Sequence, residues 1–455
     1  MSQLPSAWAT TPLLAVSELL RGVTYTKEVA ASLPAPGRLP VLRANNLRGR
    51  AFDLSDLVYV PSALVSQQQR IRSGDVVIAT SSGSISVVGK AVQSQRDMDA
   101  GFGAFCGVLR PAPALDSRYF GHFFSTEAYR TRVSAMARGS NINNLKREHF
   151  ESLIFPVAPH AEQQRIADKL DTALARVDAC RDRLARVAPL LKRFRQSVLA
   201  NAMLGRLTED WRNAKGMPWM TERRTLADLA DVITGSTPSK KDASNFGDAV
   251  PFFKPSDLGQ GYTVAKASEY LSLAGAELAR MLPACTVLVT CIGATIGKTG
   301  LARVACTTNQ QINALVARPA NALPAWLYFW CCSPAGQQSI ITNSSATTLP
   351  ILNKSRFSAL EASVPLLVEQ AEIVRRVETL FAFADRLEAR LAQAQTAVDR
   401  LTPSLLAKAF RGELVPQDPA DEPATELLKR LAHSRQAEAP KPRRRRAVAT
   451  SALNP

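Results

Sequence analysis

Two stretches of the chain repeat apolar or small residues at steps that alternate between four and three. The first stretch contains Ile166, Leu170, Ala173, Val177, Cys180, Leu184, Val187, Leu191, Phe194 and Val198. The second contains Ile373, Val377, Leu380, Ala384, Leu387, Leu391, Ala394, Val398, Leu401 and Leu405. This heptad spacing predicts two long helices whose apolar seams pair as a coiled coil.

The sequence leaves the form of these helices open in two respects. Each stretch could be an ordinary amphipathic helix packed on its own core, although two seams of equal length would then need a separate explanation. Pro189 and Pro403 lie inside the patterns, so either helix could kink or restart there. About 35 helical residues form a rod of about 50 Å, and two paired rods would hold two globular blocks a fixed distance apart.

The helical stretches belong to an internal repeat. Glu162–Ile166 aligns with Glu369–Ile373, a shift of 207 residues, and the register holds without a gap to Gly205–Leu207 over Gly412–Leu414. Upstream the similarity is weaker, but the run that begins at Asp75 matches the run that begins at Thr286. The chain therefore consists of two copies of a variable block followed by a helical block.

The variable blocks have the pattern of α+β domains. Short β-rich runs at Asp75–Thr80, Val250–Phe253 and Thr286–Thr290 alternate with clusters of Gly, Pro, Ser and Asn, and helical stretches follow near 119–137 and 325–341. The predicted division is a first domain at 1–158, helical regions at 159–208 and 366–415, a linker at 209–224, a second domain at 225–365, and a C-terminal segment at 416–455 that ends in a disordered basic tail.

Composition narrows the function. Of 455 residues 46% are hydrophobic, and 56 Lys and Arg against 39 acidic residues give a net charge of +17, which favours a polyanionic partner such as nucleic acid. Apolar runs stay well below the roughly 18 residues that cross a bilayer, and residues 1–10 do not resemble a signal peptide. The scattered Cys and His fit neither a disulfide framework nor a zinc site, and they suit a reducing cytoplasm.

Catalytic motifs are missing from the sequence. The run Gly293–Thr299 resembles a phosphate loop but has Ile292 where that loop needs its first glycine, so a tight turn between strands is the better interpretation. The chain has neither Asp-x-Lys nor Glu-x-Lys, and it lacks the Pro-Pro-aromatic loop of adenine methyltransferases and the Gly-x-Ser-x-Gly of hydrolases. We therefore expect a chain that is not an enzyme by itself and that holds no metal or cofactor.

Several short motifs carry a family resemblance through their order and repetition. They are Pro159–Ile166, Leu199–Arg212 with Gly-Arg-Leu-Thr-Glu-Asp-Trp-Arg, Gly293–Lys298 followed by Asn309–Ile312, and Ala409–Pro416. In this respect the chain resembles the specificity subunits of type I restriction–modification enzymes over nearly its whole length. The first block departs from the pattern, because Ser84–Lys90 is a looser turn and residues 105–107 lack the Asn-Gln-Gln element.

The resemblance implies a fold and a set of partners. It implies two target recognition domains that alternate with two long helices, paired as an antiparallel coiled coil with pseudo-two-fold symmetry. The domains would read two parts of a split double-stranded DNA target, and the helices would fix the gap and dock two methyltransferase subunits. S-adenosylmethionine, ATP and Mg would belong to those subunits and to restriction subunits. A modification-only system, or less readily a structural coiled-coil protein without sequence preference, stays an alternative.

Candidate DNA contacts are polar residues in loops that follow strands. They are Arg43, Asn45, Asn46, Lys254, Ser256 and Asp257, then Ser81, Ser82, Thr290, Thr295 and Lys298, and finally 141–147 with Lys146, matched by 347–356 with Lys354. Arg and Asn make two-point hydrogen bonds to guanine and adenine. For the two Asn residues, Ser256 and Asp257, a role as turn formers is equally compatible with the sequence. The spacer candidates are Ile166, Leu170, Val177, Leu184, Leu191, Ile373, Val377, Leu380, Leu387 and Leu391.

Overall fold

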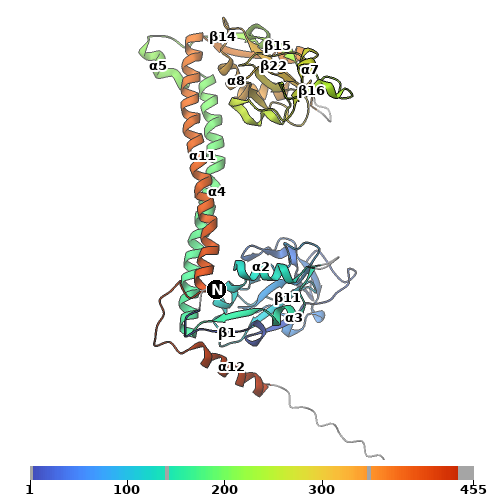
Figure 1. Ribbon diagram of the computed structural model, residues 1–455, viewed down its shortest axis with the longest axis vertical. Coiled ribbons are helices and arrows are strands. Elements are labelled where there is room, and N and C mark those ends of the chain that lie inside the picture. The colour runs from blue at the N-terminus through green and yellow to red at the C-terminus, as the bar shows by residue number, and fades with distance from the viewer. Residues whose placement is uncertain (1–3, 139–142, 346–349, 439–455) are drawn as a thin grey trace, which may run out of the picture. The chain divides into compact units, whose positions relative to one another are not determined.

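The computed structural model describes residues 4–138, 143–345 and 350–438 (Figure 1). These residues divide into two compact units, of which the first contains 4–182 and 395–438 and the second Arg183–Ala394. The predicted candidates at 141–142 and 347–349 and the basic run at 441–446 lie outside the described residues.

A four-stranded antiparallel sheet forms the core of the first domain, the globular part of the first unit. Its strand order is β2 (Ser17–Arg21), β11 (Cys106–Pro111), β7 (Val76–Ala79) and β9 (Ala91–Gln93). Val77 pairs with Val108 in the register of β7 and β11. The buried strand β7 contributes Val76 and Ile78 to one apolar core and Val77 and Ala79 to another, so both faces of the sheet are covered.

Smaller sheets and short helices surround this sheet. The other strands are β1 (Ala9–Pro12) paired with β13 (Ile154–Val157), β10 (Gly101–Phe102) beside β3 (Arg38–Leu42) and β6 (Val58–Pro61), β4 (Leu47–Arg48) with β5 (Ala51–Phe52), and β8 (Ser81–Ser82) with β12 (Asn143–Asn144). The helices are α1 (Ser117–Phe123), α2 (Glu127–Met136) and α3 (Arg147–Glu151), with single 3-10 turns at Leu13–Ala15, Ala44–Asn46, Ser62–Leu64 and Gln67–Gln69. Asp116 begins α1 because its carboxylate accepts hydrogen bonds from the backbone N–H groups of Arg118 and Tyr119.

The second domain, the globular part of the second unit, repeats this design. Its central sheet has the order β15 (Ala230–Thr234), β22 (Ile312–Ala317), β19 (Val287–Thr290) and β20 (Thr299–Leu301). A second sheet has the order β16 (Phe246–Gly247), β18 (Tyr270–Leu271), β17 (Val250–Phe253) and β21 (Thr307–Thr308), and β14 (Thr221–Thr225) pairs with β23 (Glu361–Pro365). The helices are α6 (Leu226–Leu229), α7 (Leu273–Glu277), α8 (Pro324–Cys332), α9 (Pro334–Thr342) and α10 (Lys354–Ser358), with 3-10 turns at Ala243–Asn245 and Asp257–Thr263.

Equivalent strands in the two domains confirm the repeat. The pair β1–β13 corresponds to β14–β23, and the sheet β2-β11-β7-β9 corresponds to β15-β22-β19-β20. Even the parallel pair β10–β3 has its counterpart in β21–β17. In β19, Val287 and Val289 enter one core and Leu288 the other, as neighbouring residues of β7 do. The predicted α+β class with two repeated domains is therefore confirmed.

The long helices α4 (His160–Met203) and α11 (Leu367–Ala409) lie side by side and run in opposite directions (Figure 1). In the second unit the Arg195 guanidinium lies 2.6 Å from Asp385 Oδ1, and in the first unit the Arg181 guanidinium lies 3.1 Å from Asp399 Oδ1. Both helices continue through Pro189 and Pro403, so neither restarts at its proline. The predicted antiparallel helix pair is confirmed.

The seam residues do two jobs. In the middle, Leu191, Ala384 and Leu391 form a core between the helices, with Leu184 and Leu387 beside them. Toward the ends the seam enters the domain cores: Ile166, Leu170 and Val177 are buried in the first unit, and Ile373, Val377 and the half-buried Leu380 join the core of the second. The pattern is imperfect, because Cys180 and Leu401 are exposed and Leu174 is buried where the sequence placed Ala173.

A glycine in the left-handed backbone conformation follows each long helix. Gly205 has φ 70° and Gly412 has φ 74°, a conformation that favours glycine at helix ends. A Cβ atom on Gly205 would lie 2.5 Å from the Trp219 ring, and one on Gly412 would lie 2.4 Å from Pro5 and 3.4 Å from Trp8. Each glycine therefore lets an aromatic ring close over the end of its helix.

The predicted linker and the predicted C-terminal segment both contain helices. Residues 209–224 include helix α5 (Glu209–Ala214), which follows a 3-10 turn at Arg206–Thr208, and most of β14. Helix α12 (Ala424–Glu438) buries Leu427 and Leu431 in the core of the first unit, and Ala424 N–H donates to the Ala7 carbonyl. Among the described residues, none of the helices combines the length and the apolar character that crossing a membrane requires.

Candidate nucleic-acid interface

Three loops of the first domain meet at one end of its central sheet. Strands β2 and β7 end there and strands β11 and β9 begin there, since neighbouring strands are antiparallel. The loops and the turn after β3 enclose a groove of about 770 Å³. Four of the predicted DNA contacts, Arg43, Asn45, Ser81 and Ser82, line this groove together.

The turn after β3 contains one polar side chain that is buried and closes the turn, and two that line the groove. Asn46 is buried: its Oδ1 accepts from the Arg43 backbone N–H at 2.8 Å, and its amide donates to the carbonyls of Asp53 and Asp56. The Arg43 guanidinium and the Asn45 amide both donate to Asp56 Oδ2, at 2.9 and 2.7 Å. Asn46 thus fills the turn-forming role that the sequence left open, while Arg43 and Asn45 present polar groups to the groove.

Ser81 and Ser82 form the short strand β8, whose pairing with β12 brings Lys146 to the same region. Leu145 N–H donates to the Thr80 carbonyl at 2.8 Å, just before Lys146. The Lys146 side chain is exposed and lies 3.5 Å from Glu148 Oε1. Lys146 therefore lies just after the strand that pairs with β8, but it does not line the groove itself.

The second domain repeats the turn with other side chains. Asp257 Oδ2 accepts from the Lys254 backbone N–H at 2.8 Å, as Asn46 does from Arg43, and its Oδ1 accepts from Ser268 N–H. Asp257 therefore also forms the turn. The Lys254 ammonium is paired with Glu269 and lies 5.8 Å from the centre of the Phe252 ring. Its charge is consequently partly compensated within the chain.

The remaining candidates of the second domain lie at the same end of its sheet. The residues between β19 and β20 form the predicted turn between antiparallel strands, in which Thr295 is exposed and Lys298 Nζ donates to the Ser256 carbonyl at 3.0 Å. Thr290 is fully buried in β19, and its hydroxyl has no partner among the described residues. Lys354 is exposed at the start of α10, two residues after Leu352, whose N–H donates to the Cys291 carbonyl.

Sequence reasoning missed other residues at these edges. Tyr25 and Phe105 line the groove of the first domain, and burial raises the pKa of the Tyr25 hydroxyl although nearby Arg43 lowers it. In the second domain Gln310 is exposed on the loop between β21 and β22 and accepts from the Thr237 hydroxyl. The sequence did point to Gln310, since the motif Asn309–Ile312 already carried the family resemblance. No motif in the sequence pointed to Tyr25 or Phe105.

In each domain a polar side chain contacts an acidic residue at the same repeat position of the long helix. In the first unit His122 Nε2 lies 2.9 Å from Asp171 Oδ1, and the Arg118 guanidinium lies 3.3 Å from Asp171 Oδ2. In the second unit the acid is Glu378, which accepts a 2.5 Å hydrogen bond from the Tyr262 hydroxyl. Hydrogen bonding by His122 lowers the pKa of Asp171, and burial raises the pKa of Tyr262 to about 12.

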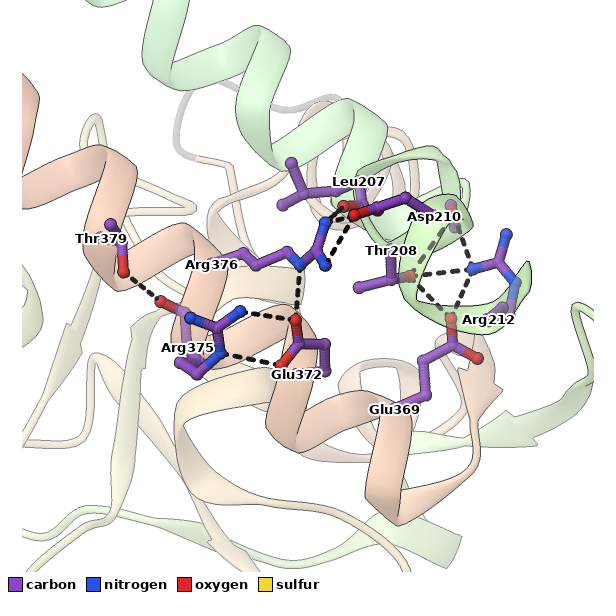
Figure 2. Close-up of polar contacts among 10 residues, drawn as sticks. Leu207, Thr208, Asp210, Arg212, Glu369, Glu372, Arg375, Arg376 and Thr379 are labelled. Atoms are coloured by element: carbon purple, nitrogen blue, oxygen red, sulfur yellow. Dashed lines mark hydrogen bonds and ion pairs between the residues drawn. The ribbon is translucent and has the colours of Figure 1, made fainter. Parts of the chain in front are cut away.

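A buried ion pair fastens α5, the short helix that follows α4, to the start of α11 in the second unit (Figure 2). The Arg212 guanidinium donates to Glu369 Oε1 at 2.5 Å and to the Thr208 hydroxyl and Gly205 carbonyl, and it lies over the Trp219 ring. Both charged side chains are nearly inaccessible, at 8% and 2%. A buried charge needs such complete pairing, so this junction depends on Arg212.

The second network of Figure 2 lies on the outer side of the same junction. Arg376 donates to Asp210 Oδ1 and Glu372 Oε1, both at 2.6 Å, and also to the Leu207 carbonyl. Arg375 pairs with Glu372 as well, and these hydrogen bonds lower the pKa of Glu372 to about 2. Within the described part of the chain, no group of three or more His, Cys, Asp or Glu is placed to hold a metal ion.

Comparison with known proteins decides the family. The family described as "Type I restriction modification DNA specificity domain" matches residues 5–187 and 218–395. The chain belongs to this family. The resemblance predicted from the sequence is confirmed, and so is the prediction of a specificity subunit rather than a catalytic one.

Curated specificity subunits match nearly the full length. The chain is 36% identical over 431 residues to the Type I restriction enzyme EcoKI specificity subunit of Escherichia coli (strain K12), with 92% of each chain covered. It is also 36% identical over 439 residues to the StySPI specificity subunit of Salmonella potsdam, again with 92% of each covered. The match therefore includes both domains and both helices of this specificity subunit.

Solved structures agree on the fold. A chain from the work described as "Structural basis underlying complex assembly and conformational transition of the type I R-M system" has a TM-score of 0.72 at 19% identity, covering 90% of this chain and 100% of that one. The HsdS subunit from Thermoanaerobacter tengcongensis has a TM-score of 0.58 at 19% identity, covering 90% and 98%. A structural coiled-coil protein without sequence preference, and a modification-only subunit, are not favoured by these matches.

Proposed function

We propose that this specificity subunit reads a two-part, asymmetric DNA target, with each domain reading one half-site. The observation that carries the proposal is the equivalence of the loops at the end of the two central sheets. The strands and turns at this end are the same in both domains, but the side chains differ. The first domain has Arg43, Asn45 and Phe105, and at the equivalent positions the second has Lys254, Ser256 and Gln311. Two copies of one frame with different polar side chains suit two different base sequences.

Charge and hydrogen bonding contribute differently to the proposed DNA binding. The net charge of +17 supplies attraction to phosphates, which is independent of sequence and falls as salt is added. Amide and guanidinium groups at the loop edges supply base discrimination. Arg43 is held by Asp56 and Lys254 by Glu269, so in the free protein each cation is kept in place before DNA arrives.

A second part of the proposal concerns the partners. We propose that two methyltransferase subunits dock on the helical regions, that restriction subunits join them, and that S-adenosylmethionine, ATP and Mg are bound by those subunits in the cytoplasm. In support, the structural relative with a TM-score of 0.72 comes from a type I system studied for complex assembly. Isothermal titration of the purified chain with S-adenosylmethionine tests this assignment. Micromolar binding without any partner subunit would contradict it.

The central experiment exchanges the first domain for that of a relative. Replacing residues 9–157 by the corresponding block of a relative, in a complex with its methyltransferase subunits, should change one half-site and leave the other and the gap unchanged. Methylome sequencing reports both half-sites at once. Altered bases in both half-sites would mean that a composite surface reads the target.

A point variant tests the second reader. Lys254→Ala should weaken recognition only in the half-site read by the second domain, by about 1–3 kcal/mol if Lys254 contacts a base. If it contacts a phosphate, binding falls for all sequences and the salt dependence becomes shallower. Arg223→Ala is the control of matched charge, since the Arg223 side chain is 81% exposed on β14, away from these loops.

A further inference from the structure

Phe105 is held in an exposed position by its own loop. The loop between β10 and β11 is a tight turn in which Cys106 N–H donates to the Gly103 carbonyl at 2.8 Å. The Phe105 carbonyl accepts from the N–H groups of Thr80 and Ser81, at 2.9 and 3.2 Å, and Gly103 N–H donates to the Leu42 carbonyl. The backbone is thus fixed on both sides, yet 68% of the Phe105 side chain is accessible to water.

A single exposed aromatic residue needs no explanation by itself. Phe105 differs because its ring lines the groove at the predicted DNA-reading edge, where Val23, Ala44 and Val58 supply further apolar surface. The polar candidates Arg43 and Ser81 line the same groove. Apolar surface that lies beside base-reading polar groups is suited to the apolar part of a base edge.

The second domain has a different side chain at this place. Strands β10 and β11 correspond to β21 and β22, so Phe105 corresponds to Gln311, the residue just before β22. Gln311 accepts from the Asn309 side-chain amide at 2.9 Å, and Gln310 beside it is exposed. The first domain therefore presents an aromatic ring where the second presents amides.

We propose that Phe105 is a specificity-determining residue of the first domain and that it contacts the 5-methyl group of a thymine in the first half-site. The inference rests on the proposed function. Among the base edges exposed in the major groove, the thymine methyl is the apolar feature, and apolar side chains recognise it. The ring is already in place on a fixed loop, so little conformational freedom is lost when it binds.

Uracil substitution tests the contact, because uracil lacks only the 5-methyl group. The complex with its methyltransferase subunits is given duplexes of its own target, established by methylome sequencing, in which each thymine on either strand is replaced in turn by uracil. For the wild-type complex, affinity should fall about fourfold to tenfold at one thymine of the first half-site. For the Phe105→Ala complex, uracil and thymine should bind equally well there, while Phe105→Leu keeps part of the preference.

Leu33→Ala is the matched control, because the Leu33 side chain is 73% exposed in the same domain but does not line the groove. It should retain the thymine preference of the wild type. The inference is overturned if uracil has no effect in the first half-site, or if Phe105→Ala responds to uracil as the wild type does. The proposed function fails separately, if the wild-type complex does not prefer its own target over unrelated duplexes.

Discussion

Asp171 and Glu378 occupy the same position in the repeat, 207 residues apart, yet they are held by different chemistry. Asp171 is bound by His122, and Glu378 is bound by the Tyr262 hydroxyl. The residue equivalent to His122 is Phe329, whose ring stacks on Tyr262 with the two ring centres 5.0 Å apart. The first domain thus holds its helix carboxylate with a histidine, and the second holds the equivalent carboxylate with a tyrosine hydroxyl whose ring stacks on a phenylalanine.

Substitution of His122 should weaken the junction of the first domain. We expect His122→Phe to lower the free energy of unfolding by about 1 kcal/mol at pH 7, because Asp171 loses its strongest hydrogen bond. The folded pKa of Asp171 is lowered, so its contribution is present above its ordinary pKa of about 3.9 and is lost as pH falls through the lowered value. Urea unfolding at pH 7 and pH 3 should therefore show a difference from wild type that shrinks in acid.

The exposed His433 on α12 provides the control, since His433→Ala removes an imidazole outside this junction. A His122→Phe effect that stays constant from pH 7 to pH 3 would mean that lost packing, rather than the Asp171 hydrogen bond, accounts for it.

Removal of Arg212 should damage the second unit. Arg212→Ala leaves the buried Glu369 carboxylate with only the Thr208 hydroxyl, and breaking a buried pair in this way costs about 3–5 kcal/mol. Urea unfolding of the chain measures the loss, and hydrogen exchange should locate it at residues 205–212. Arg223→Ala, an exposed arginine in the same unit, should change stability by less than about 0.5 kcal/mol. Equal effects of the two variants would show that the buried pair contributes nothing special.

The corresponding junction of the first unit, at Glu162, should respond to pH with the sign opposite to that of Asp171. Glu162 Oε2 accepts from Trp8 Nε1 at 2.9 Å and Oε1 from Gln417 Nε2 at 2.6 Å. Among the described residues, no cation forms an ion pair with Glu162 as Arg212 does with Glu369. Burial raises the pKa of Glu162, whereas these two donors lower it. Its stabilising effect is therefore complete below the ordinary pKa of about 4.3 and is lost as pH rises through the folded value.

Gln417→Ala removes one donor from the Glu162 carboxylate and should raise the pKa of Glu162 further. The variant should then be less stable than wild type, with a larger difference at pH 8, where the carboxylate is charged, than at pH 4.5. Thermal unfolding at the two pH values measures this difference. A loss that is the same at both would assign the effect to the second hydrogen bond of Gln417, which goes to the Gly412 carbonyl.

Lengthening both helices tests their role as a spacer. Seven residues inserted after Leu184 in α4 and seven after Leu387 in α11 preserve the seam and add about 10 Å of helix. We expect methylome sequencing to show the same half-sites with a gap longer by about three base pairs. Insertion into one helix alone should abolish activity, because the seams no longer match. An active double insertion with an unchanged gap would contradict the spacer role.

The sequence predicted the helix pair and the two repeated domains better than it predicted the residues of the candidate site. Heptad spacing and the 207-residue repeat were sufficient for the helix pair and the two domains, because burial on one face imposes a period on the residues themselves. The roles of Asn46 and Asp257 could not be decided, because a side chain that closes a turn and one that reads a base are the same residue types. Phe105 was missed because its exposure depends on backbone hydrogen bonds to Thr80 and Ser81, which leave no periodic signal.

The division of the chain has a consequence for its synthesis. The second unit is one continuous stretch, Arg183–Ala394, so all of its residues are available once α11 has largely been made. The first unit is discontinuous: its core includes Leu406, Ala409, Leu427 and Leu431, which leave the ribosome after every residue of the second unit. At about 5–20 residues per second, the first domain waits many seconds for the residues that complete its core. The half that is translated first is therefore the half that finishes folding last, and it is the half that needs protection from aggregation during translation.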